Sequence, residues 1–290
     1  MSRIKRWIIG GLLGLLLPWL SGCSALGLAY NNGAQLSWWW LDGYVDFSRE
    51  QAPRVRQHID RLFDWHRASQ LPDTAALLAS AQSQVTEPTT AALACRWQEQ
   101  VRALLEPTIV EALGHAADIV PILGEAQIDS IDKRYAKGNA EMREEFLQPD
   151  PTERRVISVK RALDRAERLY GSLDEAQKQI VAAGVAASPF DPDLWLAERQ
   201  RRQRDTLATL RKLLADRADR DQRLLALRLL VTRVERSPNP EYRAYQIRLK
   251  DYNCALAAQI HNATTTGQRR KARANLKGWE ADLRAVMLRE

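Results

Sequence analysis

Apolar residues along most of this chain recur at spacings of three and four, the period of an amphipathic helix. Within residues 48–68, Val55, Ile59, Leu62 and Phe63 follow this spacing. No segment shows the alternation of apolar and polar residues that is typical of a strand. Glycine is scarce, at 14 of 290 residues, whereas helix-forming Ala, Leu, Arg, Gln and Glu are abundant. The pattern predicts an all-α, multi-helix bundle of roughly eight to ten helices.

Prolines and polar caps divide the helical pattern into segments. Asp150, Asp191 and Asn239 each precede a proline that suits the first helical position, so each is predicted to cap a helix. Ser172 with Glu175 has the spacing of another capped start. Helices are expected over residues 48–68, 71–85, 88–123, 125–147, 151–171, 172–188, 191–236, 240–262 and 268–289.

Three of these segments have special features. Pro107 and Pro121 should bend or break the helix over 88–123. The long helical stretch near 191–236 could break around residues 218–221, and its part 198–206 is polar on every face, which suits a helix that projects into solvent or lines a groove. The last two helices are expected to form a C-terminal helical hairpin.

The first 22 residues have the order of a secretory signal peptide. Three basic residues precede a 14-residue apolar run, which is shorter than the roughly 20 residues of a membrane-spanning helix. Leu20-Ser21-Gly22-Cys23 then resembles a bacterial lipobox, which predicts cleavage before Cys23 and its acylation. The alternative is an uncleaved anchor helix with an incidental cysteine. Ser24 in place of Asp implies, by resemblance to Gram-negative lipoproteins, the periplasmic face of the outer membrane.

The predicted maturation bounds the rest of the molecule. Residues 23–33 would form the lipidated cysteine and a short tether, and 34–290 an α-helical periplasmic domain; a division into two lobes meeting near 148–190 stays open. The formal charge of +7 includes three basic residues of the leader, so the mature chain carries +4. This balance does not favour nucleic acid as a partner. In an oxidising compartment Cys95 and Cys254 either form a disulfide or remain two buried thiols.

Three consecutive tryptophans, Trp38, Trp39 and Trp40, are the least ordinary composition in the mature chain. Neighbouring residues on a helix lie about 100° apart, so the three cannot share one face. At least one should point away from the main core, toward another helix, a groove or the headgroup zone that favours Trp. The alternative is a helix that packs on two sides.

Motifs for known chemistry are missing from the sequence. There is no His-Glu-x-x-His, Cys-x-x-Cys, Gly-x-Ser-x-Gly or glycine-rich phosphate loop. His58 and His66 lie eight residues apart, farther than the spacing of four that holds a metal. We therefore expect no catalytic residue, metal or cofactor. A hydrolase that pairs His66 with Asp42 or Asp46 remains an alternative, because distant segments can assemble a site.

A set of motifs resembles an uncharacterised family of proteobacterial lipoproteins, known as a domain of unknown function. The motifs are the lipobox, Tyr30-Asn31, Trp39-Trp40-Leu41-Asp42-x-Tyr44-Val45-Asp46-Phe47, and Trp65-His66-Arg67 followed by Leu71-Pro72. The resemblance implies an all-helical, membrane-attached periplasmic protein and brings no activity with it. The candidate binding surface combines Trp38, Trp39, Trp40, Asp42, Tyr44, Asp46, Trp65, His66 and Arg67.

These observations favour a non-catalytic binding or structural lipoprotein of the cell envelope. Its expected partners are the lipid bilayer, through acylated Cys23, and an envelope protein or peptide. One alternative is a periplasmic helical chaperone, since residues 172–177 are similar to the Leu-Thr-x-x-Gln element of such proteins, with Asp in place of Thr and Ala before the Gln. The other is the hydrolase, acting on an envelope polymer or lipid.

Overall fold

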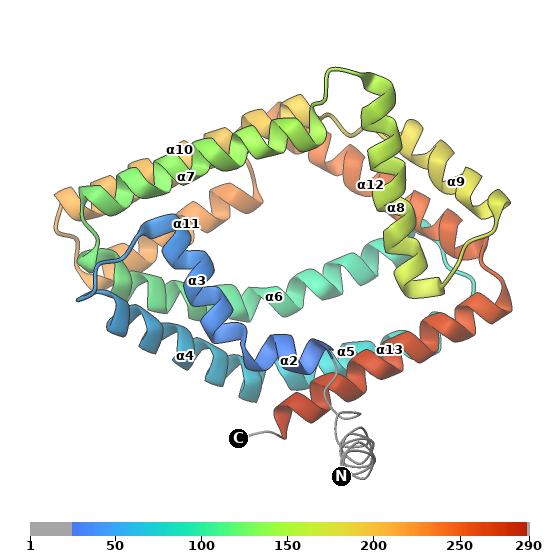
Figure 1. The fold of residues 1–290 in the computed structure, drawn as a ribbon, viewed down its shortest axis with the longest axis horizontal. Coiled ribbons are helices and arrows are strands. Elements are labelled where there is room, and N and C mark those ends of the chain that lie inside the picture. Colours follow the sequence, from blue (N-terminus) through green and yellow to red (C-terminus); the bar gives the residue numbers. More distant parts are fainter. Residues whose placement is uncertain (1–24, 289–290) are drawn as a thin grey trace, which may run out of the picture.

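The computed structural model describes residues 25–288, which contain twelve α-helices, one 3-10 helix and no strand (Figure 1). The all-α prediction is confirmed, but eight to ten helices was too few. One reason is that residues expected to form a tether are helical, and another is that the stretch 191–236 is two helices. The elements are α2 (Ala25–Asn31), α3 (Gly33–Val45), α4 (Ala52–Ser69), α5 (Leu71–Gln84), α6 (Ala91–Ile119), η2 (Val120–Ile122), α7 (Glu125–Phe146), α8 (Pro151–Tyr170), α9 (Glu175–Ala186), α10 (Pro192–Ala215), α11 (Arg220–Glu235), α12 (Pro240–Asn262) and α13 (Thr266–Met287).

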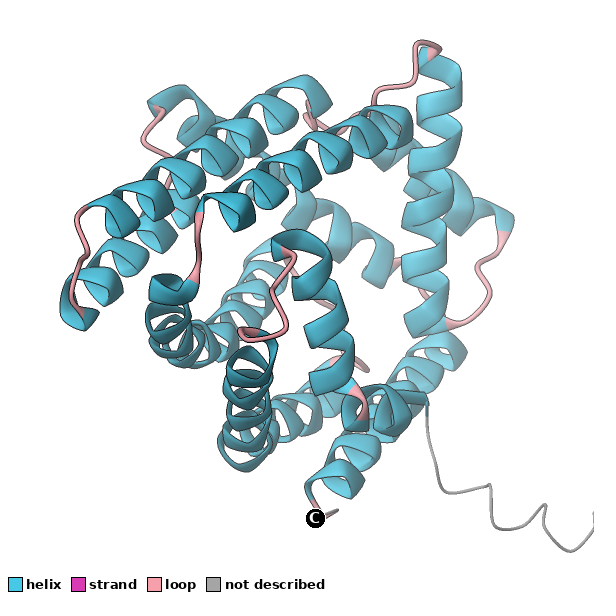
Figure 2. Cartoon of the chain, turned by 60° about the vertical axis from the view of Figure 1, so that its left-hand side comes forward, coloured by secondary structure: helices cyan, strands magenta, loops and turns pink. Residues whose placement is uncertain are grey.

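The helices form a closed circuit around the centre of the molecule (Figure 1). Helices α7 and α10 run side by side along one edge, and α5 and α13 pair along the opposite edge. Helices α8, α9 and α12 close one end, while α11 packs on α6 at the other. A view from a second direction shows the same arrangement, with short loops between the helices (Figure 2).

In the described part of the chain, three clusters of buried apolar residues lie along this circuit, and the first two are joined by Leu41 and Phe47. The largest surrounds Ile128 of α7 and joins α6, α10 and α11. A second packs Trp38 of α3 on Val55 and Ile59 of α4. The third packs Leu71 of α5 on α13. The core is therefore distributed along the circuit instead of filling one central volume.

Most predicted helix starts are confirmed. The side chains of Asp150, Asp191 and Asn239 accept hydrogen bonds from backbone N–H groups in the first turns of α8, α10 and α12. The predicted start at Ser172 is wrong. Asp174 caps α9 instead, because its carboxylate accepts from the N–H of Gln177 at 2.9 Å while the Gln177 side chain accepts from the N–H of Asp174 at 3.0 Å.

Of two predictions for the long helices, the one that the prolines bend or break the helix is confirmed, and the C-terminal hairpin is not. Helix α6 continues through Pro107 without a break, although it is visibly curved (Figure 1), whereas Pro121 lies in the 3-10 turn that ends this stretch. The expected C-terminal hairpin does not form. Helix α12 packs on α6 and α9, while α13 packs chiefly on α5 because its buried Leu283 and Val286 meet Leu71.

The N-terminal predictions fall mostly on residues whose placement is not described. The signal peptide, Cys23 and Ser24 lie outside the described range. The remainder of the expected tether is not extended, because α2 occupies Ala25–Asn31 and packs on α13. Among residues 25–288, none of the helices combines the length and apolar character needed to cross a membrane.

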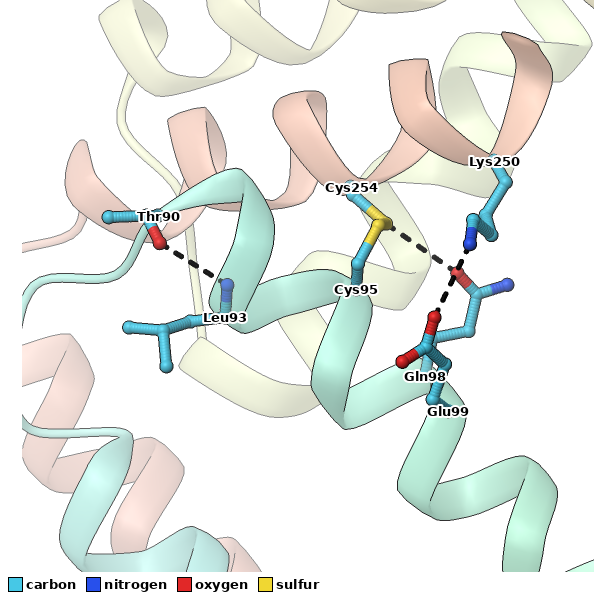
Figure 3. Close-up of a disulfide and its surroundings, with 7 residues drawn as sticks. All are labelled: Thr90, Leu93, Cys95, Gln98, Glu99, Lys250 and Cys254. Carbon is cyan, nitrogen blue, oxygen red and sulfur yellow. Dashed lines mark hydrogen bonds and ion pairs between the residues drawn. A yellow bond between two sulfur atoms is a disulfide. The ribbon is translucent and has the colours of Figure 1, made fainter. Parts of the chain in front are cut away.

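A disulfide between Cys95 and Cys254 fastens α12 to α6, so the structure contains the pairing that the sequence left open (Figure 3). The two Cα atoms lie 5.3 Å apart across a sequence separation of 159 residues. One turn further along α6, Glu99 pairs with Lys250, one turn earlier on α12, at 3.3 Å. The two helices therefore run antiparallel at this contact.

Candidate functional site

Helix α3 has two apolar faces, and only one of them is packed. Trp38, Leu41 and Val45 contact the apolar clusters of the core. Trp39 and Trp40 point elsewhere and remain 61% and 64% exposed. The spacing of about 100° per residue requires this division, since three successive residues cannot share a face.

A cavity of about 420 Å³ lies between α3, α7, α10 and α12. This volume is in the range of small-molecule sites. Aromatic rings form much of its wall, and two arginines contribute the charge. The lining residues are Trp40, Leu41, Tyr44, Val45, Ile131, Tyr135, Trp195, Arg199, Arg202, Gln203, Thr206 and Tyr242. We call it the aromatic cavity.

The two arginines of the aromatic cavity differ in their partners. Arg202 lies 3.0 Å from a carboxylate oxygen of Glu198 and 5.8 Å from the centre of the Tyr242 ring. Arg199 has no carboxylate partner among the described residues. Its Nε donates to Asn139 Oδ1 at 3.0 Å, which leaves its other N–H donors without a protein acceptor in this part of the chain. Arg199 is thus the uncompensated charge of the cavity.

Asn139 holds Arg199 in place. Its Oδ1 also accepts from Gln203 at 3.1 Å, and its Nδ2 donates to Gln203 Oε1 at 2.8 Å. Asn139 is buried, so this pair of amides is shielded from water. The arrangement fixes the Nε end of the guanidinium and leaves the rest of the group for a ligand.

Glu198, the residue before Arg199, has several hydrogen-bond partners. It is buried, and its carboxylate accepts from Arg201, Arg202 and Ser237. Burial alone would raise the pKa of Glu198, but the hydrogen bonds from these three residues outweigh it, so the pKa lies below its usual value. Glu198 therefore stays ionised and shares its charge between Arg201 and Arg202, which makes it a structural residue.

A second, more open groove of about 720 Å³ lies between α3 and α7. Its α3 wall carries Trp39, Trp40 and Tyr44, and its α7 wall carries basic residues. Trp40 packs on Tyr44 with ring centres 4.8 Å apart, and both residues also line the aromatic cavity. The full lining is Trp39, Trp40, Asp42, Gly43, Tyr44, Asp46, Ser130, Lys133, Arg134 and Lys137. We call it the α3–α7 groove.

The structure divides the predicted binding surface among three places. Trp38 is in the core, and Trp39, Trp40, Asp42, Tyr44 and Asp46 line the groove. The third group is the Trp65-His66-Arg67 segment at the end of α4. There Arg67 lies over the ring of Tyr30 from α2, at 5.6 Å from its centre.

His66 does not pair with the carboxylates proposed for a hydrolase. Its Nδ1 is hydrogen-bonded to the hydroxyl of Tyr30 at 2.9 Å, and burial lowers its pKa. Asp42 instead accepts from the backbone N–H of Phe47, and exposed Asp46 has a left-handed backbone with φ of 57°. Within residues 25–288, no group of three or more His, Cys, Asp or Glu side chains is arranged to hold a metal ion.

Several residues of the aromatic cavity were not singled out by sequence, notably Tyr135, Trp195, Arg199 and Tyr242. Only one feature of the sequence indicated that any of these residues could line a groove. The segment 198–206 is polar on every face, which suits a groove-lining helix, and Arg199 lies at its start. The other walls come from α3, α7 and α12, whose proximity is a tertiary property.

Comparisons with known proteins identify a family but no activity. No curated protein and no solved structure matches the chain. A family model described as a family of unknown function, DUF6279, matches residues 43–243. The match confirms the resemblance to an uncharacterised family, and it begins within the tryptophan motif, so it does not cover the lipobox. Because the matched range spans well over half of the sequence, the chain belongs to the DUF6279 family of unknown function.

Proposed function

We propose that this chain is a lipid-anchored, non-catalytic binding protein of the cell envelope, and that the aromatic cavity holds an amphiphile with one anionic group. The sequence around Cys23 supports attachment to the periplasmic face of the outer membrane. The observation that carries the binding function is Arg199, a guanidinium without a carboxylate partner among the described residues, in a cavity walled by aromatic rings.

The charge pattern selects the ligand class. Arg202 is bonded to the Glu198 carboxylate, which it shares with Arg201, whereas Arg199 has no carboxylate partner among the described residues and can receive one carboxylate or phosphate. Guanidinium groups bind such anions through two parallel N–H bonds, and these charge-assisted bonds are roughly twice as strong as neutral ones. Tyr135, Trp195 and Tyr242 offer apolar surface to the rest of the ligand. A fatty acid or a lipid fragment with a single anionic group has this chemistry.

A fluorescence titration tests the proposal with defined probes. The first probe is 11-(dansylamino)undecanoic acid and the second is its uncharged methyl ester. We expect the wild-type protein to prefer the acid, because only the acid can accept charge-assisted bonds from Arg199. Arg199→Gln should weaken binding of the acid about tenfold or more, since a hydrogen bond to a charged group contributes about 1.5–3 kcal/mol, and should leave the ester nearly unchanged.

The matched control is Arg204→Gln, which removes an exposed arginine of the same helix that does not line the cavity. It should change neither affinity. Equal affinities of the wild-type protein for the acid and the ester would contradict an anion site at Arg199. Failure of both probes to bind would contradict the binding function of the cavity.

A further inference from the structure

We propose that the exposed face of α3 docks on an anionic phospholipid membrane, with its tryptophans in the headgroup zone and Lys133 and Lys137 of α7 on lipid phosphates. The inference rests on the proposed membrane attachment and adds a second contact. It concerns the outer side of the α3–α7 groove and not the ligand of the aromatic cavity.

The composition and geometry of α3 provide the first argument. Leu36, Trp39, Trp40 and Gly43 fall within one face of the helix, opposite the buried face of Trp38, Leu41 and Val45. Leu36, Trp39 and Trp40 are 47%, 61% and 64% exposed, although Trp40 also packs on Tyr44 at the edge of the aromatic cavity. A helix with one packed and one unpartnered apolar face is suited to lie in a membrane interface, where Trp is enriched.

The charges across the α3–α7 groove provide the second argument. Lys133 and Lys137 are exposed, lie one turn apart on α7, and have no carboxylate partner among residues 25–288. Arg134, between them, is held by the Tyr44 ring at 5.2 Å and by Glu141 at 3.6 Å. The two ammonium groups next to exposed indoles complement an anionic lipid surface. Asp42 and Asp46 on the α3 wall balance these two lysines in number, so it is the exposed position of the ammonium groups beside the indoles, and not a net positive groove, that suits such a surface.

The position of the chain start provides the third argument. Twenty-four residues precede α2, and the predicted lipidation site Cys23 lies two residues before Ala25. With a helical rise of 1.5 Å per residue, Trp39 cannot be much more than about 20 Å from Ala25. An acyl anchor at Cys23 would therefore keep α3 close enough for its exposed face to reach the bilayer.

The experiment uses the full acylated chain, purified from membranes and added to vesicles of phosphatidylglycerol and phosphatidylcholine. The phosphatidylcholine carries bromine on its acyl chains, and bromine quenches indole fluorescence on contact. We expect partial quenching of the wild-type protein, because Trp39 and Trp40 are two of the seven tryptophans that follow Cys23. Trp39→Phe combined with Trp40→Phe should remove most of this quenching, and Lys133→Glu with Lys137→Glu should weaken it in the anionic vesicles. Trp97→Phe, a tryptophan of α6 hydrogen-bonded to Gln84, is the matched control and should retain it.

The outcomes separate the docking face from the anchor. Vesicle-bound protein whose quenching is the same in the wild-type and the Trp39 and Trp40 variant would overturn the docking face and leave the anchor intact. Protein that lacks an acyl group by mass spectrometry, yet is quenched through Trp39 and Trp40, would overturn the anchor and support the docking face. Protein that neither floats with vesicles nor is quenched would overturn both. Circular dichroism of each variant verifies that it is folded.

Discussion

At the residue scale, the adjacent residues Glu198 and Arg199 of α10 differ in their hydrogen bonding. Glu198 is saturated by Arg201, Arg202 and Ser237, so it stabilises the junction of α10 with the start of α12. Arg199 makes one hydrogen bond to Asn139 and is otherwise available. The same polar segment therefore supplies one structural carboxylate and one candidate ligand-binding guanidinium.

Buried histidines should make stability depend on pH. Burial is the main cause that lowers the pKa of His58, His66 and His261 below the usual 6.5, so the folded protein favours their neutral forms. The stability from these groups is fully present above their unfolded pKa of about 6.5 and is lost as the pH falls toward the lowered folded values, because the unfolded chain then binds more protons. Urea titrations should show a free energy of unfolding that decreases between about pH 7 and pH 5.

Two hydrogen-bond patterns support this prediction. Nδ1 of His261 is bonded to Tyr170 at 2.8 Å and its Nε2 to the carbonyl of Glu87 at 2.7 Å, so the neutral ring is fully satisfied as a donor and an acceptor. His58 and His115 face each other through Nδ1 atoms 2.9 Å apart, which leaves room for one shared proton but not two. The triple variant His58→Gln, His66→Gln and His261→Gln should lose most of this dependence of stability on pH. A free energy of unfolding that rises on acidification over this range would contradict the account.

At the element scale, local sequence signals predicted where helices start, whereas tertiary contacts determine which helices pack together. Asp150, Asp191 and Asn239 cap their helices through bonds within a few residues, so sequence alone could identify them. Local signals could not show whether α12 and α13 pack together as a hairpin. The turn before α13 shows where the chain reverses, but the apolar face of α13 meets α5, which lies far away in sequence.

The disulfide between α6 and α12 should contribute strongly to stability. It closes a loop of 159 residues, and linking such distant residues restricts the unfolded chain. Replacing Cys95 and Cys254 together by Ser should lower the free energy of unfolding by about 2–5 kcal/mol. Denaturant titrations with and without a reducing agent measure this effect. The reductant should destabilise the wild-type protein and leave the double variant unchanged; equal stability of both proteins without reductant would contradict a structural role.

At the scale of the whole molecule, the circuit of helices explains why the site could only partly be predicted. The aromatic run of α3 was visible in the sequence, and the proximity of Trp40 to Arg199 was not. The cavity walls come from α3, α7, α10 and α12, which span more than 150 residues of chain and are brought together by closure of the circuit. Because the buried apolar residues are spread over several clusters, no single hydrophobic segment indicates where the circuit closes.

Closure of the circuit also places the two proposed surfaces next to each other. Trp40 and Tyr44 line both the aromatic cavity and the α3–α7 groove. In our proposals the groove contacts the membrane and the cavity holds an amphiphile, so the ligand would lie close to the bilayer from which an amphiphile can be drawn. Membership in a family of unknown function leaves this ligand to be identified by direct observation.

A crystal structure with 12-bromododecanoic acid tests the central claim most directly, because anomalous scattering locates the bromine without ambiguity. We expect the carboxylate within about 2.7–2.9 Å of the Arg199 guanidinium and the bromine among the rings of the aromatic cavity. Bromine bound only outside this cavity, or an aromatic cavity that stays empty at saturating ligand, would contradict it.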